Sequence, residues 1–391
     1  MEKKILIVKG ESQYNVLRIA TDEIAKGFAN KGYYVEVLDM LNPKEKILIH
    51  KKMTSESYAF IFSCQALRFE DLQNDGTPFL ESVKSPYFTW IFDDLLHHLH
   101  KVQNQVYDYT YMLSVDEEMQ DIAITMYPHL KNIAGLIHGG FCGMEDAVEK
   151  DIEVLFPGTI SKEPVIEDII EEPIPVERLI ADKTIKQIEE MPWLSVRKAL
   201  ERVMNTLGEE MSGDLLLELS GVILYVDLYI RYQCRYRMMK ALLESGVKLH
   251  VVGSGTNDLL EQYKDNITVC GAKDITEVVK LIQRSKVVIN PFPVIFYKGA
   301  HERIFTALLN KAVCFTPYSE YLDDLLGNRV QFIDLKNLDN MVKDVNKVLE
   351  LYDGEVMQNL LEDNYRYALE NHTWEIRGKE IAEFYESIYG E

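Results

Sequence analysis

Three polar residues, His301, Glu302 and Arg303, stand directly before the apolar stripe of a predicted helix. A helix N-terminus offers free N–H groups and a partial positive charge, which together suit a phosphate. Arg303 and Lys298 would add charge-assisted contacts, and Glu302 or Thr306 would accept hydrogen bonds from sugar hydroxyls. The alternative is that Glu302 only favours the helix dipole and that Arg303 is solvated.

Glycines follow the predicted strands of the second half of the chain. They let a ligand approach the backbone closely, although each one alone is equally consistent with a tight turn. Parallel sheets bind ligands at the carboxyl ends of their strands, so we expect these glycines to converge on a nucleotide-type ligand. The predicted donor-binding residues are Gly158, Thr159, Arg235, Gly253, Ser254, Gly255, Gly271, Lys298, Gly299, His301, Glu302, Arg303 and Thr306.

Arginines recur in the segment 230–237. The spacing of Arg231 and Arg235 places them on one helix face, whereas Arg237 falls on another. One of the pair is expected to reach a phosphate, with solvation or pairing to an acid as the alternative.

Acids and histidines follow a predicted strand of the first half. Asp93, Asp94, His97 and His98 are candidates for the general base of a transfer reaction, and His138 ends a later strand. The alternatives are a helix cap at the aspartates, histidines on helix faces and a structural His138. The adjacent aspartates could also suggest a metal site. They lack the D-x-D spacing of metal-dependent transferases, so no metal is expected. On the acceptor side, Gly10, Ser12 and Gln13 form a loop after the first strand.

The elements that position these residues are alternating strands and helices. Residues 3–10, a helical pattern and a second strand form a βαβ unit, and the same rhythm returns after residue 150. A chain of 391 residues exceeds one core, so two α/β domains are expected. An acidic, proline-broken stretch at about 162–215 predicts a helical insertion in the second domain, with a dimer contact as one possible role.

Composition narrows the function. A net charge of −21 is the wrong sign for binding nucleic acid. Five scattered cysteines, no CxxC pair, no signal peptide and no apolar run of about 18 residues predict a cytoplasmic protein without a transmembrane segment. Walker, G-x-S-x-G and H-E-x-x-H motifs are missing.

Several ordered segments resemble the donor half of GT-B glycosyltransferases, most closely the bacterial group related to spore-maturation glycosyltransferases. They are YVDLYIRYQCRYRMMKALLESGVKLHVVGSG, ITVCGAKDITEVVKLIQRSKVVINPFP, HERIFTALLNKAVCFTPYSEYL and ENHTW. In the first half, WIFDDLLHH and IAGLIHGG lie where related proteins have an aromatic–Asp-Asp segment and a His-Gly hinge.

The resemblance implies a fold and an activity. The fold would be two Rossmann-like domains facing across a cleft: residues 1–140 on the acceptor side, 141–375 for the nucleotide-sugar, and 376–391 as a helix crossing back. The activity would be metal-independent transfer of a hexosyl or N-acetylhexosaminyl group from a nucleotide-sugar, a UDP-sugar first. The acceptor would be a glycan, a protein or an envelope precursor, and no further cofactor is expected.

One position departs from the family pattern. Arg303 and Phe305 match, but Thr306 stands where the family has a Glu that holds the ribose hydroxyls. Two rival hypotheses therefore remain: a nucleotide-sugar epimerase of the same fold, and a non-catalytic binding subunit that pairs with an active transferase.

Overall fold

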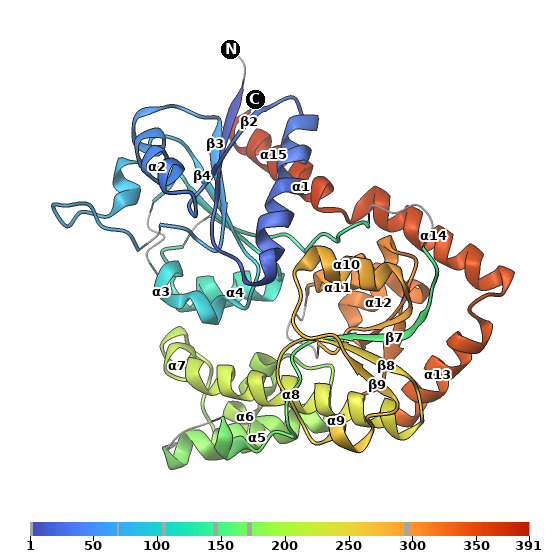
Figure 1. Ribbon diagram of the computed structural model, residues 1–391. Coiled ribbons are helices and arrows are strands. Elements are labelled where there is room, and N and C mark those ends of the chain that lie inside the picture. The colour runs from blue at the N-terminus through green and yellow to red at the C-terminus, as the bar shows by residue number, and fades with distance from the viewer. Residues whose placement is uncertain are drawn as a thin grey trace. The chain divides into compact units, whose positions relative to one another are not determined.

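The computed structural model describes residues 3–68, 70–103, 107–130, 132–143, 148–169, 174–292 and 298–390. The chain divides into two compact units, one made of residues 1–139 and 370–391, the other of residues 140–369. Both are α/β units around a six-stranded sheet, as the sequence predicts (Figure 1).

The first unit holds a sheet of strand order β2-β1-β3-β4-β5-β6, and every neighbouring pair is parallel. Its central strands are short runs of apolar and β-branched residues buried on both faces, which is typical of a covered parallel sheet. The strands are β1 (Lys4–Lys9), β2 (Tyr34–Asp39), β3 (Phe60–Cys64), β4 (Tyr87–Ile91), β5 (Thr110–Ser114) and β6 (Ile133–Gly135).

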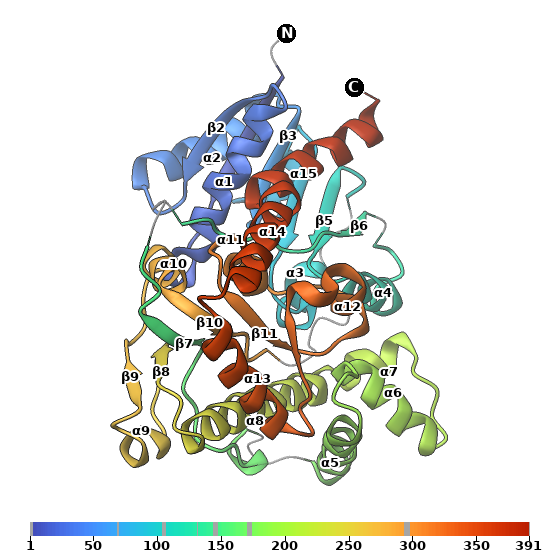
Figure 2. The ribbon, with the colours of Figure 1, turned by 90° about the vertical axis from the view of Figure 1, so that its right-hand side faces the viewer.

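Helices cover both faces of this sheet. The last helix, α15, crosses α1 so closely that a Cβ on Gly27 would lie 2.1 Å from the Glu375 carbonyl oxygen. Figure 2 shows α15 beside α1. The helices are η1 (Gln13–Asn15), α1 (Val16–Asn30), α2 (Pro43–Ser55), η2 (Phe79–Ser82), η3 (Leu95–His98), α3 (Leu99–Val102), α4 (Glu117–Met126) and α15 (Trp374–Tyr389).

The second unit repeats the design with strand order β12-β11-β10-β7-β8-β9, again all parallel. All strand carboxyl ends therefore meet at one edge of the sheet. The strands are β7 (Ile152–Pro157), β8 (Leu249–Val252), β9 (Ile267–Val269), β10 (Ser285–Ile289), β11 (Val313–Pro317) and β12 (Gln331–Ile333).

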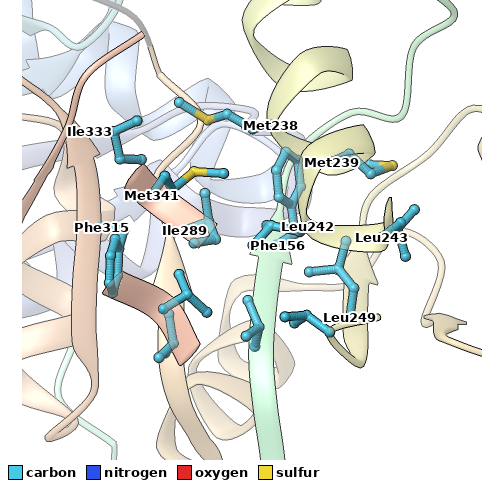
Figure 3. Packing of buried hydrophobic residues seen from close by; sticks show 14 of the residues in the cluster. Phe156, Met238, Met239, Leu242, Leu243, Leu249, Ile289, Phe315, Ile333 and Met341 are labelled. Carbon is cyan, nitrogen blue, oxygen red and sulfur yellow. The ribbon is translucent and has the colours of Figure 1, made fainter. Parts of the chain in front are cut away.

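One face of this sheet carries a methionine-rich core. Figure 3 shows Met238, Met239 and Leu242 of the long helix α8 packed with strand residues such as Phe156. Met341 of α13 and Leu361 of α14 join the same cluster. The helices of this part are α8 (Ser220–Glu244), α9 (Leu259–Gln262), α10 (Ile275–Gln283), α11 (Glu302–Leu309), α12 (Glu320–Leu326), η5 (Gly327–Arg329), α13 (Leu338–Leu351) and α14 (Glu355–Asn371).

The stretch between β7 and α8 contains short helices, as its prolines and periodic apolar residues predict. They are η4 (Ile166–Asp168), α5 (Pro175–Glu190), α6 (Val196–Thr206) and α7 (Gly213–Glu218). Helices α5 and α6 pack on each other and on α8, which places α8 between the insertion and the sheet. In the described part of the chain, no helix is long and apolar enough to cross a membrane.

Candidate functional site: the carboxyl edges of the two sheets

The glycines of the second unit meet at the carboxyl edge of its sheet. A Cβ on Gly253 would lie 1.9 Å from the carbonyl oxygen of Gly158, and one on Gly255 would lie 2.0 Å from that of Ile160. Gly253 also donates its N–H to Gly271, at 3.1 Å. These turns therefore meet, and backbone packing between them already requires Gly253 and Gly255.

Gly158 is different, because side chains rather than backbone surround it. The position of its missing Cβ lies 3.5 Å from Pro291 Cγ and 3.7 Å from Arg235 Nε. Thr159 follows Gly158 in the chain. Ser254 is exposed, and its carbonyl oxygen accepts a hydrogen bond from the Ile160 N–H. The Gly158 backbone therefore lies close to a guanidinium group, and a Cβ at this position would touch side chains and no backbone.

Arg303 is held inside this edge by two strand ends. Its Nη1 donates to Oδ1 of Asn290 at 2.8 Å, and the Asn290 amide donates to the Thr316 hydroxyl at 3.1 Å. Asn290 follows β10 and Thr316 belongs to β11, so neighbouring strands fix the guanidinium. Burial lowers the pKa of Arg303, and the adjacent Glu302 carboxylate opposes that shift.

Two more arginines approach from α8. Arg235 lies over Gly158, and its Nε is buried without a hydrogen-bond partner. Burial lowers the pKa of Arg235 to about 10, and repulsion from Arg303 and Arg231 adds to the shift. Arg231 is paired with Asp227 and lies with its guanidinium carbon 5.7 Å from the centre of the Phe292 ring. The predicted common face of Arg231 and Arg235 is confirmed, because the exposed Arg237 instead donates to the Leu335 carbonyl.

The start of α11 adds a second kind of group. His301 caps the helix: its Nδ1 accepts from the Arg303 N–H at 3.2 Å, and its ring packs on Phe292 at 4.5 Å. The side chains of His301 and Glu302 are each 16% exposed. Burial raises the pKa of the Glu302 carboxyl, with Arg303 opposing the shift. Lys298 and Gly299 precede this helix, directly after residues 293–297 of the predicted loop, which lie outside the described residues.

Thr306 does not occupy a position from which it can reach a ribose. It is 1% exposed, its hydroxyl donates to the Glu302 carbonyl at 2.9 Å, and the same oxygen accepts from the Phe141 N–H at 3.1 Å. Asn310, one turn further, binds the same segment by accepting from Gly143 and donating to Phe141. Of the two residues that the sequence assigned to sugar hydroxyls, Thr306 is therefore covered by residues 140–143, whereas Glu302 keeps some exposure.

The first unit presents a carboxylate at its sheet edge. Asp93 follows β4 and is 61% exposed; its Oδ2 accepts from the Gln65 side-chain amide at 2.5 Å and lies 3.6 Å from His98 Nε2. The surrounding protein partly desolvates the carboxylate, which would raise its pKa. The interaction with His98 outweighs this effect, so the pKa of Asp93 is lowered. An ionised carboxylate with an open oxygen is the state a general base requires.

The neighbouring candidates have structural positions. Asp94 caps η3 by accepting from the Leu96 N–H at 2.8 Å, which is the capping alternative stated above. His97 is exposed on that short helix, and it is His98, not His97, that lies beside Asp93. His138 is 4% exposed, lies among the rings of Trp90, Phe92 and Trp374, and accepts at its carbonyl from Arg377 Nε.

Left-handed backbone marks the same edge. Gln65, Ala66 and Arg68 have φ of 60°, 49° and 65° just after β3, and Tyr14 and Asn15 have 54° and 59° after β1. Non-glycine residues in this region store strain, and such residues cluster at functional sites.

The predicted acceptor loop lies in this strained stretch. Its Ser12 hydroxyl accepts from the Leu17 N–H at 2.9 Å, so that group is used to start α1. Gly10 accepts from Arg18 at its carbonyl oxygen, and Gln13 begins η1.

Two residues of these sheet edges were not predicted from the sequence. Asn290 orients Arg303, and Gln65 holds Asp93. Both are single polar residues at strand ends. Their position directly after apolar runs is the sequence feature that could have identified them. Within the described ranges, no three His, Cys, Asp or Glu side chains converge as a metal site.

Comparisons with known proteins agree with this geometry. Residues 235–383 match a family model described as glycosyl transferase-like. No curated protein matches the chain. Among solved structures, sucrose-phosphate synthase from Thermosynechococcus elongatus is 9% identical, covers 100% of both chains and gives a TM-score of 0.54.

Two further structures are similar over nearly the whole chain. Alr3699/HepE from Anabaena, in complex with UDP and glucose, is 12% identical over 98% of this chain and 99% of its own, with a TM-score of 0.53. AviGT4, a glycosyltransferase involved in avilamycin A biosynthesis, is 9% identical over 98% and 97%, with a TM-score of 0.51. The chain therefore has the two-domain α/β GT-B fold, and its residues 235–383 are similar to a glycosyl transferase-like domain.

Proposed function

We propose that the protein is a glycosyltransferase that takes a sugar from a nucleoside-diphosphate donor. The observation that carries the proposal is the group of three arginines at one sheet edge, Arg231, Arg235 and Arg303. Among the described residues, Arg235 Nε is buried and has no hydrogen-bond partner, and it lies 3.7 Å from the position that a Cβ on Gly158 would take. A buried cation without a counter-charge is costly unless a ligand supplies one, and a diphosphate supplies two or more charges.

The arginines also account for the chemistry. Breaking the bond between the sugar and the diphosphate leaves negative charge on the diphosphate, and fixed cations in a partly buried site stabilise that charge most. We propose that Arg235 and Arg303 perform this role without a metal ion. Asn290 and Thr316 hold Arg303 in place beforehand, so little reorganisation is needed when the charge develops.

We infer that Glu302 takes over the contact with sugar hydroxyls. Its side chain keeps some exposure beside Arg303, whereas Thr306 is enclosed. Uridine is the preferred base in this proposal because the similar Alr3699/HepE structure is a complex with UDP. Such donors are made in the cytoplasm, which is the compartment we propose. The closer resemblance to the spore-maturation group and the hexosyl or N-acetylhexosaminyl nature of the sugar stay predictions.

For the acceptor, we propose Asp93 as the general base and Gln65 with His98 as the groups that position it. A deprotonated carboxylate can remove the proton from an attacking hydroxyl. The acceptor class, a glycan, a protein or an envelope precursor, follows from the family resemblance alone.

A second candidate function is a binding subunit without catalysis. The enclosed Thr306 favours it, because the residue in the place of the family Glu is unable to reach a ribose. Both hypotheses require the nucleotide site, and they differ only in turnover.

Thermal unfolding with UDP, ADP, GDP and CDP tests the site. A ligand at 100 times its dissociation constant raises the free energy of unfolding by about 2.7 kcal/mol. We expect UDP to stabilise the wild type and to lose this effect in Arg235→Ala; no shift with any nucleotide would refute the donor site. Slow release of free sugar from a UDP-sugar would then favour the transferase, and binding without any turnover would favour the subunit.

A further inference from the structure

Helix α2 (Pro43–Ser55) of the first unit has an outer face that its fold does not need. Ile49 and Met53 are buried against the unit, and they suffice to anchor a helix of this length. Ile47 is nevertheless 76% exposed, Leu48 is 43% exposed and Leu41, just before the helix, is 55% exposed. Helix α2 thus has apolar residues on its inner side and again at its outer surface.

Lysines flank the outermost apolar residue. Lys44, Ile47 and Lys51 are spaced i, i+3 and i+7, so they share the helix face opposite Ile49. Lys46 is exposed as well. In the part of the chain that the structure describes, the ammonium groups of Lys44, Lys46 and Lys51 make no ion pair and no hydrogen bond.

The acids near the helix are turned inward. Glu45 accepts from the Asp39 N–H at 2.7 Å and from the Asn42 amide at 2.6 Å, so it serves the start of the helix. Lys52, the remaining lysine, is bound to Glu36 and Glu56. The outer face therefore carries positive charge in a chain whose net charge is −21.

We propose that this face of α2 binds the surface of a membrane that contains anionic phospholipids. Unpaired lysines attract the headgroup phosphates, and Ile47, Leu48 and Leu41 enter the boundary with the acyl chains. The lysine stems are flexible and their ammonium groups act as point charges, which suits a fluid array of phosphates.

A protein partner fits this composition less well. Protein interfaces are depleted in lysine and enriched in arginine and aromatic residues, and the exposed set here holds lysine, isoleucine and leucine. The positive charge that matches anionic lipid is also local. Because a chain with a net charge of −21 is repelled by anionic lipid as a whole, we attribute vesicle binding to this face.

Sedimentation with vesicles tests the proposal. We expect the full chain to bind vesicles of phosphatidylcholine with phosphatidylglycerol at low salt, and to be released in 0.5 M NaCl because the Debye length becomes only a few ångströms, roughly 4 Å. Each surface lysine contributes about fivefold in partitioning, so Lys44→Glu with Lys51→Glu should reduce binding at least about 25-fold. The matched control Lys343→Glu with Lys347→Glu, exposed on α13, should leave it unchanged.

The apolar contribution has its own control. Ile47→Ser should weaken vesicle binding severalfold, whereas Val356→Ser, at an 86% exposed position of α14, should not. Circular dichroism verifies that the variants fold. The proposal is overturned if anionic vesicles are not bound, if neutral phosphatidylcholine vesicles bind equally, or if the α2 variants bind as the wild type does; binding of an acidic protein without vesicle binding also overturns it.

Discussion

The carboxyl edges of the two sheets use their charged residues in opposite ways. At the first edge, Arg18 is fully paired: it binds both oxygens of Asp39 and donates to the Gly10 carbonyl. At the second edge, Arg235 has a buried Nε without a partner, close to two more arginines. The arginine of the first edge is used within the fold, whereas Arg235 at the second edge is the one that we propose contacts the diphosphate.

The exposed charged groups at the two edges also have opposite sign. The first edge offers the carboxylate of Asp93, and the second offers guanidinium groups beside Gly158. Two all-parallel sheets of six strands therefore present different chemical groups, because function depends on the side chains at the strand ends and not on the fold. The comparison predicts that removing the base from the first edge lowers turnover without changing the nucleotide affinity. Removing an arginine from the second edge should instead lower the nucleotide affinity.

The largest expected effect is that of Asp93→Asn on turnover. If Asp93 removes the acceptor proton, its loss lowers kcat by about 10²–10⁴-fold. The UDP affinity should stay within about twofold, because the change removes no donor contact. Steady-state transfer assays and calorimetric titration with UDP measure the two quantities.

Asp94→Asn is the matched control for that experiment. Asp94 caps η3, and because Asn caps a helix about as well as Asp, stability and kcat should both stay near their wild-type values. Equal loss of turnover in both variants would mean that Asp93 acts through the local fold and is not the base.

The next effect is that of Arg235→Ala on nucleotide affinity. Hydrogen bonds to charged groups contribute about 1.5–3 kcal/mol, so the dissociation constant for UDP should rise by about 10- to 150-fold. Arg237→Ala is the control on the same helix, since that side chain points to Leu335 instead, and it should leave the affinity unchanged. Unaltered UDP binding in Arg235→Ala would place the diphosphate elsewhere.

Much of the fold could be predicted from local sequence. Short β-branched runs such as residues 3–10 and 151–157 read as buried parallel strands because both faces of each sheet are covered. The arginine pair on α8 was equally accessible, since helical spacing alone separates Arg231 and Arg235 from Arg237.

The rest depends on contacts between distant segments. Periodicity put Thr306 on a polar helix face but gave no sign that residues 140–143 cover that face. Gln65 and Asn290 gain their roles only where two strand ends meet. Helical spacing defines which residues share a face, and the tertiary fold decides what lies against it.

A smaller effect concerns acid stability at the first edge. Pairing with Arg18 lowers the pKa of Asp39 to about 2, from an ordinary value of 3.8. Because the folded-state pKa is the lower one, this pair stabilises the protein above about pH 4, and the stabilisation disappears as the pH falls towards 2. It corresponds to about 2 kcal/mol.

Asp39→Asn should therefore lower the free energy of unfolding at pH 7 by about that amount, about 2 kcal/mol, and lose its effect near pH 2. Denaturant titrations at several pH values measure this. Asp22→Asn is the control, because Asp22 pairs with Lys9 at a more exposed position and should cost less than about 1 kcal/mol. A cost of Asp39→Asn that does not change with pH would contradict the ion-pair account.

The smallest expected effect separates structure from ligand binding at the second edge. Thr306→Val keeps the volume but removes the hydroxyl that serves Phe141 and Glu302, so stability should fall by about 1 kcal/mol. Thr306→Ser keeps the hydroxyl and should restore most of that loss. The UDP affinity should be the same in both, because the hydroxyl is enclosed by residues 140–143. If Thr306→Val instead weakens UDP binding while Thr306→Ser does not, the hydroxyl contacts the nucleotide, and the role proposed for Glu302 passes back to Thr306.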